Sequence, residues 1–356
     1  MRVLHLPSNI ASILSHTVRG LSTLGVEARG LVVRNSPIQS AEGVTVIDTT
    51  WGKPMSPAWF RTRIAGFRHL LEGILWADVL HWYYGSTVFP LGIDLKMIGL
   101  LRKPAVVEWL GSDIRIPEVE FGDNPYYRQA FQKGYEYQTE SYGRSRRTQK
   151  RFVKAGFLPL MIPCMVQYLQ KDIVRQFYRV MPRIMLDHIT PCYPDPGKRR
   201  PLIVHAPSAP VAKGTPAVLR AIRELQKRFE LEFVLIEGMP RQKAIEIIQK
   251  ADLFLDQFVI GYYGMAAVEA MAYGKPVLCY MKPSLLGETS SDFPVMNATA
   301  DDLPEKIEAL LSDGNLRRDV GERSRAYVEK HHDAVKWARK LTGIYQELME
   351  RRKRLQ

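Results

Sequence analysis

Cysteine is scarce in this sequence, and the few cysteines do not form pairs. The 356 residues include three, Cys164, Cys192 and Cys279, and none belongs to a CxxC motif. An odd number of widely spaced cysteines indicates neither a disulfide framework nor the ligand spacing of a zinc site. We therefore expect a protein of a reducing compartment that has no metal centre.

Long hydrophobic runs are also absent. The nearest, residues 156–166, contains Pro159 and Pro163 and is shorter than the about 18 residues that a membrane-spanning helix needs. The N-terminal sequence MRVLHLPSNIASIL is partly apolar, but Pro7, Ser8 and Asn9 interrupt any signal-peptide core. We read this segment as a first strand and expect a cytoplasmic protein.

Two nucleotide-binding motifs are missing as well. No GxGxxG occurs, which argues against a nicotinamide dehydrogenase, and no GxxxxGK[ST] occurs, which argues against a P-loop phosphotransferase. What the sequence does contain is positive charge: 50 Lys and Arg against 37 Asp and Glu give a formal net charge of +13. This balance favours anionic partners such as nucleotide phosphates, acidic lipid surfaces or nucleic acid.

Strand-like and helix-like patterns alternate along the chain. An apolar run at 3–7 is followed by apolar residues at helical spacing up to Gly25 and by a second run at 31–33. Strand, helix and strand in this order indicate a βαβ unit and a parallel sheet. The alternation continues with strands at 44–47, 79–82 and 105–109. It restarts with strands at 202–205, 233–236, 253–256 and 277–280, separated by helices at 215–229, 241–250 and 264–273.

The length and this alternation together predict two domains. A chain of 356 residues exceeds the about 100–200 residues typical of one domain. We predict two doubly wound α/β domains of parallel sheet, residues 1–190 and 202–335, that face each other across a cleft. The Pro- and charge-rich stretch 191–201 is the predicted linker, and residues 336–356 form a predicted helix that packs across the domain junction.

The most informative segment runs from Gly261 to Val277, GYYGMAAVEAMAYGKPV. Gly264 stands at a predicted helix start, where free backbone N–H groups and the positive end of the helix dipole receive an anion such as a diphosphate. Glu269, further along the same helix, can accept hydrogen bonds from ribose hydroxyls. An equally good explanation is a helix of small residues that packs tightly on a sheet.

This segment resembles the donor-site motif of retaining glycosyltransferases of the GT-B fold, in particular the large fourth sequence family, also called group 1. The matching residues are Tyr263, Gly264, Glu269, Ala270, Met271, Ala272, Gly274, Pro276 and Val277. The resemblance implies two Rossmann-like domains, with Glu269 on the nucleotide ribose and Gly264 on the diphosphate. It further implies that Tyr263 and the amides of Met265 and Ala266 belong to the donor site.

One motif position differs. The family has a glutamate that contacts sugar hydroxyls eight positions before Glu269, and this chain has Gly261 there. Asp256 follows a predicted buried strand and can reach the donor sugar in its place. A satisfied polar pair of Asp256 and Gln257 that closes the strand explains these residues as well.

A second segment, from His205 to Thr215, is similar to the family's phosphate-binding stretch, an arginine followed five positions later by Lys-Gly. Lys213 and Gly214 match, and Ser208 stands at the arginine position. An ammonium group at a helix start is well placed to neutralise a leaving diphosphate, so Lys213 is a predicted catalytic residue and Ser208 and Gly214 are predicted donor ligands. A solvated surface lysine is the alternative for Lys213.

A third segment, Leu110-Gly111-Ser112-Asp113, stands where many family members have His-Gly facing the transferred sugar. Asp113 is a second predicted catalytic residue, although an N-cap aspartate on a short helix is a simpler explanation. We predict that Gly111, Ser112 and Asp113 form the acceptor side together with Asn9, whose turn points to the cleft in this fold.

The resemblance predicts an enzyme that moves a sugar from a nucleotide-diphosphate sugar to a glycan or lipid-linked acceptor, with retention of anomeric configuration. No Asp-x-Asp is present, which fits a metal-independent reaction, and we expect no cofactor. One rival is a diverged, non-catalytic nucleotide-binding protein, because Gly261, Ser208 and Leu110 replace three motif residues. A second rival is a nucleotide-sugar 2-epimerase of the same architecture.

Positive charge is concentrated between Arg144 and Lys154, in a stretch from 141 to 171 without acidic residues. These cations predict contact with the inner face of a membrane, and a solvated helix face is the alternative. We do not expect nucleic-acid binding, because base-stacking and groove-reading motifs are absent.

Overall fold

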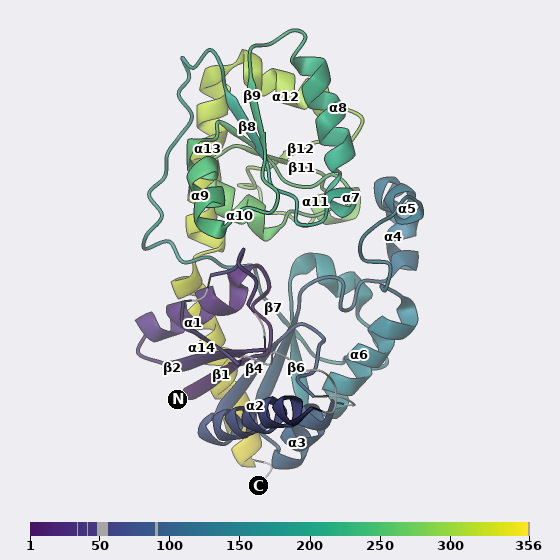
Figure 1. Ribbon diagram of the computed structural model, residues 1–356, viewed down its shortest axis with the longest axis vertical. Helices are drawn as coiled ribbons and strands as arrows, with labels where there is room; N and C mark the ends of the chain where they lie inside the picture. Colours follow the sequence, from purple (N-terminus) through teal and green to yellow (C-terminus); the bar gives the residue numbers. More distant parts are fainter. Residues whose placement is uncertain (34, 41, 48–55, 90–91, 355–356) are drawn as a thin grey trace. The chain divides into compact units, whose positions relative to one another are not determined.

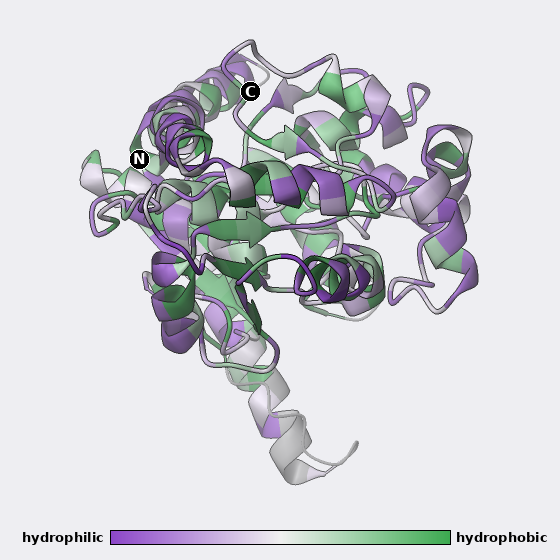
Figure 2. Ribbon diagram, turned by 90° about the horizontal axis from the view of Figure 1, so that it is seen from above, coloured by the Kyte–Doolittle hydropathy of each residue, from purple (hydrophilic) through white to green (hydrophobic). Residues whose placement is uncertain are grey.

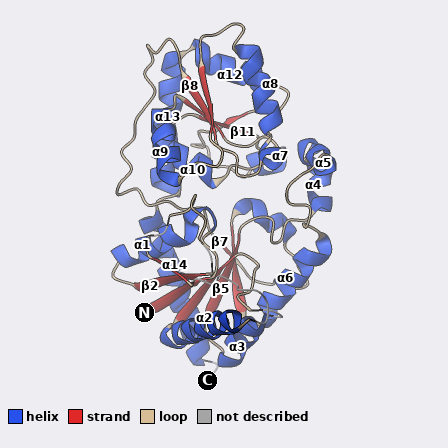
Figure 3. Cartoon of the chain, viewed as in Figure 1, coloured by secondary structure: helices blue, strands red, loops and turns tan. Residues whose placement is uncertain are grey.

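The computed structural model describes residues 1–33, 35–40, 42–47, 56–89 and 92–354. The chain forms two compact units (Figure 1). Unit 1 comprises residues 1–115, 141–185 and 334–356, and unit 2 comprises residues 116–140 and 186–333. Each unit has strands flanked by helices (Figure 3).

Unit 1 is built on a parallel sheet that has seven strands within the described ranges, in the order β3-β2-β1-β4-β5-β6-β7. The strands are β1 (Arg2–Leu6), β2 (Glu27–Val32), β3 (Val44–Val46), β4 (Val79–Tyr83), β5 (Ala105–Trp109), β6 (Phe157–Met161) and β7 (Tyr178–Arg179). From β1 the chain proceeds to one edge through β2 and β3, and it then returns to build the other half from β4 onward. This reversal places a topological switch point between β1 and β4, where sites commonly form in such sheets.

Helices connect the strands of unit 1. They are η1 (Ile10–Ser12), α1 (Ile13–Thr23), α2 (Pro57–Trp76), α3 (Ile93–Leu101), α6 (Tyr142–Lys154), η3 (Pro163–Tyr168) and α14 (Ala334–Arg354). Every residue of β4 and β5 is buried, as expected when helices cover both faces of a parallel sheet. No helix of the described residues is long and apolar enough to cross a lipid bilayer.

A fully buried ion pair lies at the centre of unit 1. The Arg183 guanidinium donates to both carboxylate oxygens of Glu108 on β5, at 2.6 and 3.2 Å, and to Thr17 Oγ1 on α1 at 2.6 Å. His81 Nε2 lies 3.3 Å from the same carboxylate, and His81 Nδ1 lies 2.6 Å from the Tyr345 hydroxyl on α14. Because a buried charge is costly unless it is paired, this network ties α1, the sheet and α14 together.

Unit 2 has a parallel sheet of five strands among its described residues, in the order β12-β11-β10-β8-β9. The strands are β8 (Leu202–His205), β9 (Glu232–Leu235), β10 (Leu253–Leu255), β11 (Val277–Cys279) and β12 (Met296–Asn297). The helices are α4 (Pro117–Asp123), α5 (Pro125–Gln132), α7 (Pro210–Lys213), α8 (Thr215–Leu225), α9 (Arg241–Lys250), α10 (Met265–Ala272), α11 (Pro283–Leu286), α12 (Leu303–Ser312) and α13 (Gly314–His331). The switch point of this sheet lies between β8 and β10.

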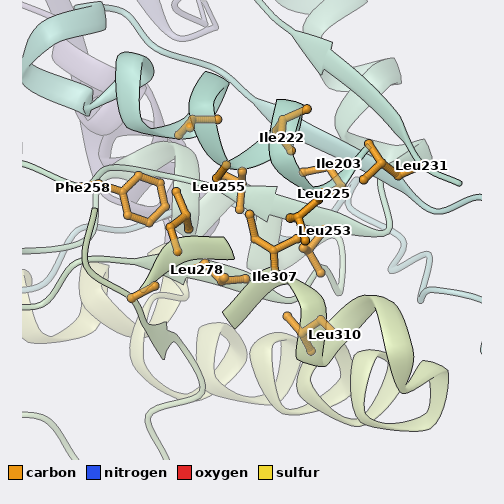
Figure 4. Close-up of a cluster of buried hydrophobic side chains, with 14 of the residues drawn as sticks. Ile203, Ile222, Leu225, Leu231, Leu253, Leu255, Phe258, Leu278, Ile307 and Leu310 are labelled. Carbon is orange, nitrogen blue, oxygen red and sulfur yellow. The ribbon is translucent and has the colours of Figure 1, made fainter. Parts of the chain in front are cut away.

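The core of unit 2 is aliphatic. Side chains of α8, of the central strands and of α12 point toward one another (Figure 4), with Ile222, Leu255 and Ile307 among them, each at most 3% exposed. In Figure 2 the strands are mostly hydrophobic, whereas the helices carry both hydrophilic and hydrophobic residues along their length. This is the pattern of helices that bury one side against a sheet.

Residues 116–140 belong to unit 2, although the sequence placed them within a first domain of residues 1–190. Three contacts hold them there. The Asn124 amide donates to the Val259 carbonyl at 2.8 Å, the Glu136 carboxylate accepts from the N–H groups of Val211 and Ala212, and Glu120 pairs with buried Lys282. These contacts join residues that are far apart in the sequence, so no local sequence pattern predicts them.

Two further predicted boundaries differ from the units. The stretch 191–201 runs along unit 2, because the Cys192 N–H donates to the Tyr273 carbonyl and buried Lys275 donates to the Cys192 carbonyl. The final helix α14 belongs to unit 1 and packs against α1. The predicted fold class of parallel-sheet α/β domains is confirmed, and the helix at 241–250 has the predicted bounds.

His81, the buried histidine beside the Arg183–Glu108 ion pair, makes the stability of unit 1 depend on pH. Burial lowers the pKa of His81 to about 4, below its ordinary value of 6.5. Between these two values the unfolded chain binds a proton that the native state does not. The free energy of unfolding should therefore fall as the pH falls from 6.5 to 4, by up to about 1.4 kcal/mol per pH unit for this one group.

Urea unfolding followed by tryptophan fluorescence measures this effect, because all six tryptophans lie in the sequence of unit 1. We expect His81→Gln to flatten the dependence of stability on pH. His69→Gln, which changes an exposed histidine of α2, is the control and should leave the dependence unchanged. Equal pH slopes in both variants would contradict the assignment.

Candidate functional site

The predicted donor residues of unit 2 gather at the switch point of its sheet. β8 and β10 are parallel neighbours, with His205 opposite Leu255, so the loops after these two strands begin side by side. The loop after β8 leads to Lys213 at the end of α7, and the loop after β10 leads to Gly264 at the start of α10. Chain segments far apart in sequence thus meet at one edge of the sheet.

Lys213 lies against the start of α10. Its Nζ donates to Gln257 Oε1 at 2.6 Å and lies 3.7 Å from Asp256 Oδ1. A Cβ atom at position 264 would lie only 3.1 Å from Lys213 Nζ, so glycine leaves the room in which the ammonium sits. The structure thus brings a cation to a helix N-terminus, the arrangement that receives a phosphate.

Asp256 already occupies one of the N–H groups at the start of α10. Its carboxylate, with a side chain only 1% exposed, accepts a hydrogen bond of 2.6 Å from the Gly264 N–H. The N–H groups of Met265 and Ala266 lie in the first turn of α10, where no intrahelical carbonyl accepts them, and both residues are partly exposed. These two amides and Lys213 are therefore the groups that an incoming anion can meet.

Glu269 is partnered by a residue that the sequence reasoning missed. Its carboxylate forms an ion pair with the guanidinium of Arg241, and both side chains are partly exposed. Arg241 opens α9 directly after the loop that follows β9, at the carboxyl end of a strand next to β8. That position past a strand end was the signal that could have found it.

The Tyr263 ring packs into the interior of unit 2. Its ring stacks on Tyr262 with the centroids 4.5 Å apart, and its hydroxyl lies 3.3 Å from His332 Nε2. Both Tyr263 and His332 are buried, so Tyr263 anchors the loop within unit 2. Among the described residues no cluster of His, Cys, Asp or Glu has the arrangement of a metal site.

Gly261 occupies a position where a side chain would be strained and tightly packed. Its φ is +81°, and a Cβ atom there would lie 3.1 Å from both Asn124 Nδ2 and Lys282 Cβ. Lys282 is fully buried, 3.2 Å from Glu120 and 3.0 Å from Asp123. The glutamate expected from the family pattern would be disfavoured here by the positive φ and by the close approach of the Asn124 and Lys282 side chains.

The other two predicted donor residues flank Lys213. Ser208 is exposed in the loop before α7, and Gly214 ends α7 with a φ of +78°. Phe258 packs against Gly214, and the Phe258 N–H donates to the Lys213 carbonyl at 3.0 Å. The backbone on both sides of Lys213 is thus fixed by the neighbouring loop.

In unit 1 the predicted acceptor-side loops are joined through the loop after β4. Ser112 Oγ lies 2.9 Å from the Tyr84 hydroxyl, and Ser8 Oγ, next to Asn9, lies 3.3 Å from Ser86 Oγ. Loops at the carboxyl ends of β1, β4 and β5 therefore form one polar edge. Gly111 has a φ of +156° within it.

Asp113 and Asn9 both have their polar atoms engaged, Asp113 within its own loop and Asn9 with Ser15 of α1 and with the segment after β2. The Asp113 carboxylate accepts from the Gly111 N–H at 2.8 Å and the Leu110 N–H at 3.2 Å, and burial raises the pKa of Asp113 to about 6. It is not a helix N-cap as the simpler explanation required, because the next helix, α4, begins at Pro117 after Ile116. The Asn9 side chain donates to the Ser40 carbonyl at 2.6 Å.

The architecture and the site define a class of protein. Two parallel-sheet Rossmann-like units, with polar loops at the switch points of both sheets, form the GT-B architecture. Residues 220–327 match the family of glycosyl transferases group 1, and this range includes Arg241, Gly264 and Glu269. This family match confirms the resemblance to group 1 glycosyltransferases that the sequence motifs indicated. No curated protein sequence matches the chain.

Solved structures support the same fold. Sucrose-phosphate synthase (tll1590) from Thermosynechococcus elongatus superimposes with a TM-score of 0.63 at 13% identity, over 98% of this chain and 100% of the other. WaaG, a glycosyltransferase involved in lipopolysaccharide biosynthesis, gives a TM-score of 0.57 at 14% identity, over 97% and 99%. Anabaena Alr3699/HepE, solved in complex with UDP-glucose, gives 0.55 at 12% identity, over 97% and 99%. The family match and this fold support sugar transfer in general.

The steric account of Gly261 predicts unequal costs for two glycine substitutions. Gly238 also has a positive φ, +64°, but a Cβ atom there would meet nothing within 4 Å. Gly238→Ala should cost about 1 kcal/mol of stability from backbone conformation alone. Gly261→Ala should cost about 1–3 kcal/mol more, because its Cβ also overpacks against Asn124 and Lys282. Calorimetric unfolding compares the two, and equal losses would refute the steric account.

Proposed function

We propose that this protein transfers a sugar from a nucleotide-diphosphate sugar to a glycan or lipid-linked acceptor, with retention of anomeric configuration. The observation that carries the proposal is the position of Lys213 Nζ against Gly264 at the start of α10. A cation and a helix N-terminus that converge at a sheet's switch point suit a diphosphate, and the family match of residues 220–327 supports a sugar nucleotide as its source.

Unit 2 supplies the donor contacts in this proposal. The amides of Met265 and Ala266 and the ammonium of Lys213 hold the diphosphate, and the Glu269 carboxylate accepts from the ribose hydroxyls. Arg241 acts as a positioning residue, because its ion pair with Glu269 orients that carboxylate. Ser208 and Gly214 contribute to the loop that encloses the phosphates.

The chemistry requires stabilisation of the charge that develops on the leaving diphosphate. The transition state has oxocarbenium character, so negative charge grows on the diphosphate as its bond to the sugar breaks. Lys213 and the start of α10 lie where that charge forms, and preorganised positive groups stabilise it most effectively. In this scheme Lys213 takes the part that a divalent cation plays in other transferases. Asp256 holds the Gly264 N–H and the Lys213 ammonium in place.

Unit 1 supplies the acceptor side in this proposal. Asn9, Gly111 and Ser112 belong to the polar edge formed by the loops after β1, β4 and β5. The carboxylate of Asp113 is only 2% exposed and accepts two backbone N–H groups of its own loop. We assign Asp113 the role of fixing Gly111 and Ser112, and we leave acceptor contact to those two residues.

Nucleotide binding provides the first test. Titration calorimetry with UDP, ADP and GDP should show binding of at least one of them. Lys213→Ala should weaken this binding at least about tenfold through loss of a charge-assisted phosphate contact. Glu269→Ala should weaken it by a similar factor, whereas Lys227→Ala, which changes an exposed lysine just past α8, should have no effect. Failure of every nucleoside diphosphate to bind would remove the basis of the proposal.

A nucleotide-binding protein without transfer activity is the second candidate. Gly261 favours it, because a side chain there would be tightly packed and strained, and the glutamate that contacts the donor sugar in the family pattern is absent. Product analysis of nucleotide sugars incubated with glycan and lipid-linked acceptors distinguishes the candidates. Nucleotide binding with every donor left intact would favour the non-catalytic protein, and a changed sugar without acceptor would indicate an epimerase.

We further propose that α6 contacts an anionic membrane surface. Arg147, Lys150, Arg151 and Lys154 are all exposed on this helix. Their spacing of three or four residues places them on neighbouring positions of one side, and such cations gain about 1 kcal/mol each near an anionic bilayer. This contact would bring a lipid-linked acceptor to unit 1.

Vesicle sedimentation tests this membrane contact. The protein should bind vesicles containing phosphatidylserine and should be released by salt, and reversal of Arg147, Lys150 and Lys154 to Glu should weaken binding at least about tenfold. A control with the same change of charge reverses exposed lysines of unit 2, Lys227, Lys243 and Lys250. Equal losses in the two triple variants would show that net charge rather than α6 is responsible.

A further inference from the structure

Unit 2 contains a pocket of about 320 Å³ outside the proposed donor site. α5 forms one side of it, α7 and α8 form the other, and the loop after β10 contributes Phe258 and Val259. All of its lining residues belong to unit 2, including those of the segment 116–140. This volume falls in the range of pockets that bind small organic molecules.

The interior of this pocket is apolar. Val211 on α7, Ala217 on α8 and Phe258 and Val259 from the loop line it, and three of these four residues are at most 7% exposed. The apolar cluster next to it joins Tyr127, Ala130 and Tyr135 to Ala209 and Ala212, so the packing of α5 against α7 is firm. A rigid apolar lining favours an aromatic ring or a short hydrocarbon group over water.

Two cations line the same pocket. Lys133 follows the end of α5 and Arg220 lies on α8, and both side chains are exposed. Neither has an ion-pair or hydrogen-bond partner for its side chain within the described part of the chain. Most other exposed arginines of unit 2 are paired, as Arg228 is with Glu308 and Arg318 with Glu322. Lys133 and Arg220 thus supply positive charge that the protein itself does not neutralise.

We propose that this pocket is a second ligand site, which binds a small amphipathic anion: an apolar ring or short chain that carries one carboxylate, sulfonate or phosphate. The apolar part fills the space over Phe258 and Ala217, and the anionic group meets Lys133 and Arg220. The hydrogen-bonding atom of Tyr126, which also lines the pocket, is already engaged with Asp301, so the two cations select the ligand's charge. The proposal does not depend on the proposed sugar transfer.

The site is distinct from the proposed donor site. Lys213, Gly264 and Glu269 do not line the pocket, although Gly214, which belongs to the proposed phosphate loop, and Phe258 do. A nucleoside diphosphate held at α10 therefore leaves the pocket accessible. Variants at Lys213 separate the two sites in an experiment.

Anilinonaphthalene sulfonate, an aromatic sulfonate whose fluorescence rises in apolar surroundings, is a suitable probe. The full-length protein should bind it saturably, with one molecule per chain at the tightest site. The double variant Lys133→Ala/Arg220→Ala should bind it about tenfold more weakly, because two charge contacts are lost. Ala217→Phe, which fills the pocket and keeps both cations, should abolish the tight site.

Three controls make the result specific. Arg223→Ala removes an exposed cation one turn further along α8, outside the lining, and should leave probe affinity unchanged. Lys213→Ala should leave it unchanged too, and N-phenylnaphthylamine, which has similar rings without the sulfonate, should be insensitive to removal of the two cations. Circular dichroism of each variant verifies that it is folded.

Two results would overturn the proposal. Unchanged affinity of the double variant for the sulfonate would show that the probe binds elsewhere. Loss of binding in Lys213→Ala with retention in Ala217→Phe would place the anion at the donor loops and leave the pocket without a ligand.

Discussion

The parallel pairing of β8 with β10 is the constraint on which the candidate site depends. It fixes His205 opposite Leu255, so the two loops that follow start at the same edge of the sheet. From there one loop carries Lys213 and the other carries Asp256, Gln257 and Gly264. Residues more than forty positions apart meet because the strand order reverses between these two strands, and not because of any local sequence signal.

The candidate site depends secondly on the pairing of opposite charges at this edge of the unit 2 sheet. Asp256 lies beside Lys213 and accepts the Gly264 N–H, and Glu269 is paired with Arg241. A ligand that binds here exchanges existing contacts for new ones, so its affinity reflects a difference between two sets of interactions. These existing contacts keep the polar side chains oriented. Preorganised polar groups are effective at stabilising charge that develops only as a bond breaks.

Local patterns predicted much of the secondary structure. The mostly apolar runs at 105–109 and 202–205 are fully or largely buried strands with the predicted bounds. They could be predicted because a strand that is buried on both faces has a nearly continuous run of apolar residues. The helix predicted at 215–229 ends at Leu225 instead, since Gln226 to Phe229 form a turn. Lys213 and Gly264 were predicted from the sequence and do lie together. Their roles remain predictions.

The segment 116–140 shows what local patterns could not supply. Its contacts join Asn124 to Val259 and Glu120 to Lys282, pairs separated by more than a hundred residues, and neither helix has a long apolar repeat. The ion pair of Arg241 with Glu269 was not predicted for a related reason. A charged residue at the end of a loop belongs to no periodic pattern that would indicate its partner.

The same segment also explains the most conspicuous departure from the family pattern. Gly261, the buried Lys282 and the polar residues of α4 form one packed arrangement, so a side chain at position 261 would disturb the contacts that hold residues 116–140 in unit 2. A single substitution that restores the motif would insert a carboxylate into a filled space whose ammonium is already paired. In the proposed transfer reaction, contacts with the donor sugar would therefore have to come from groups other than residue 261.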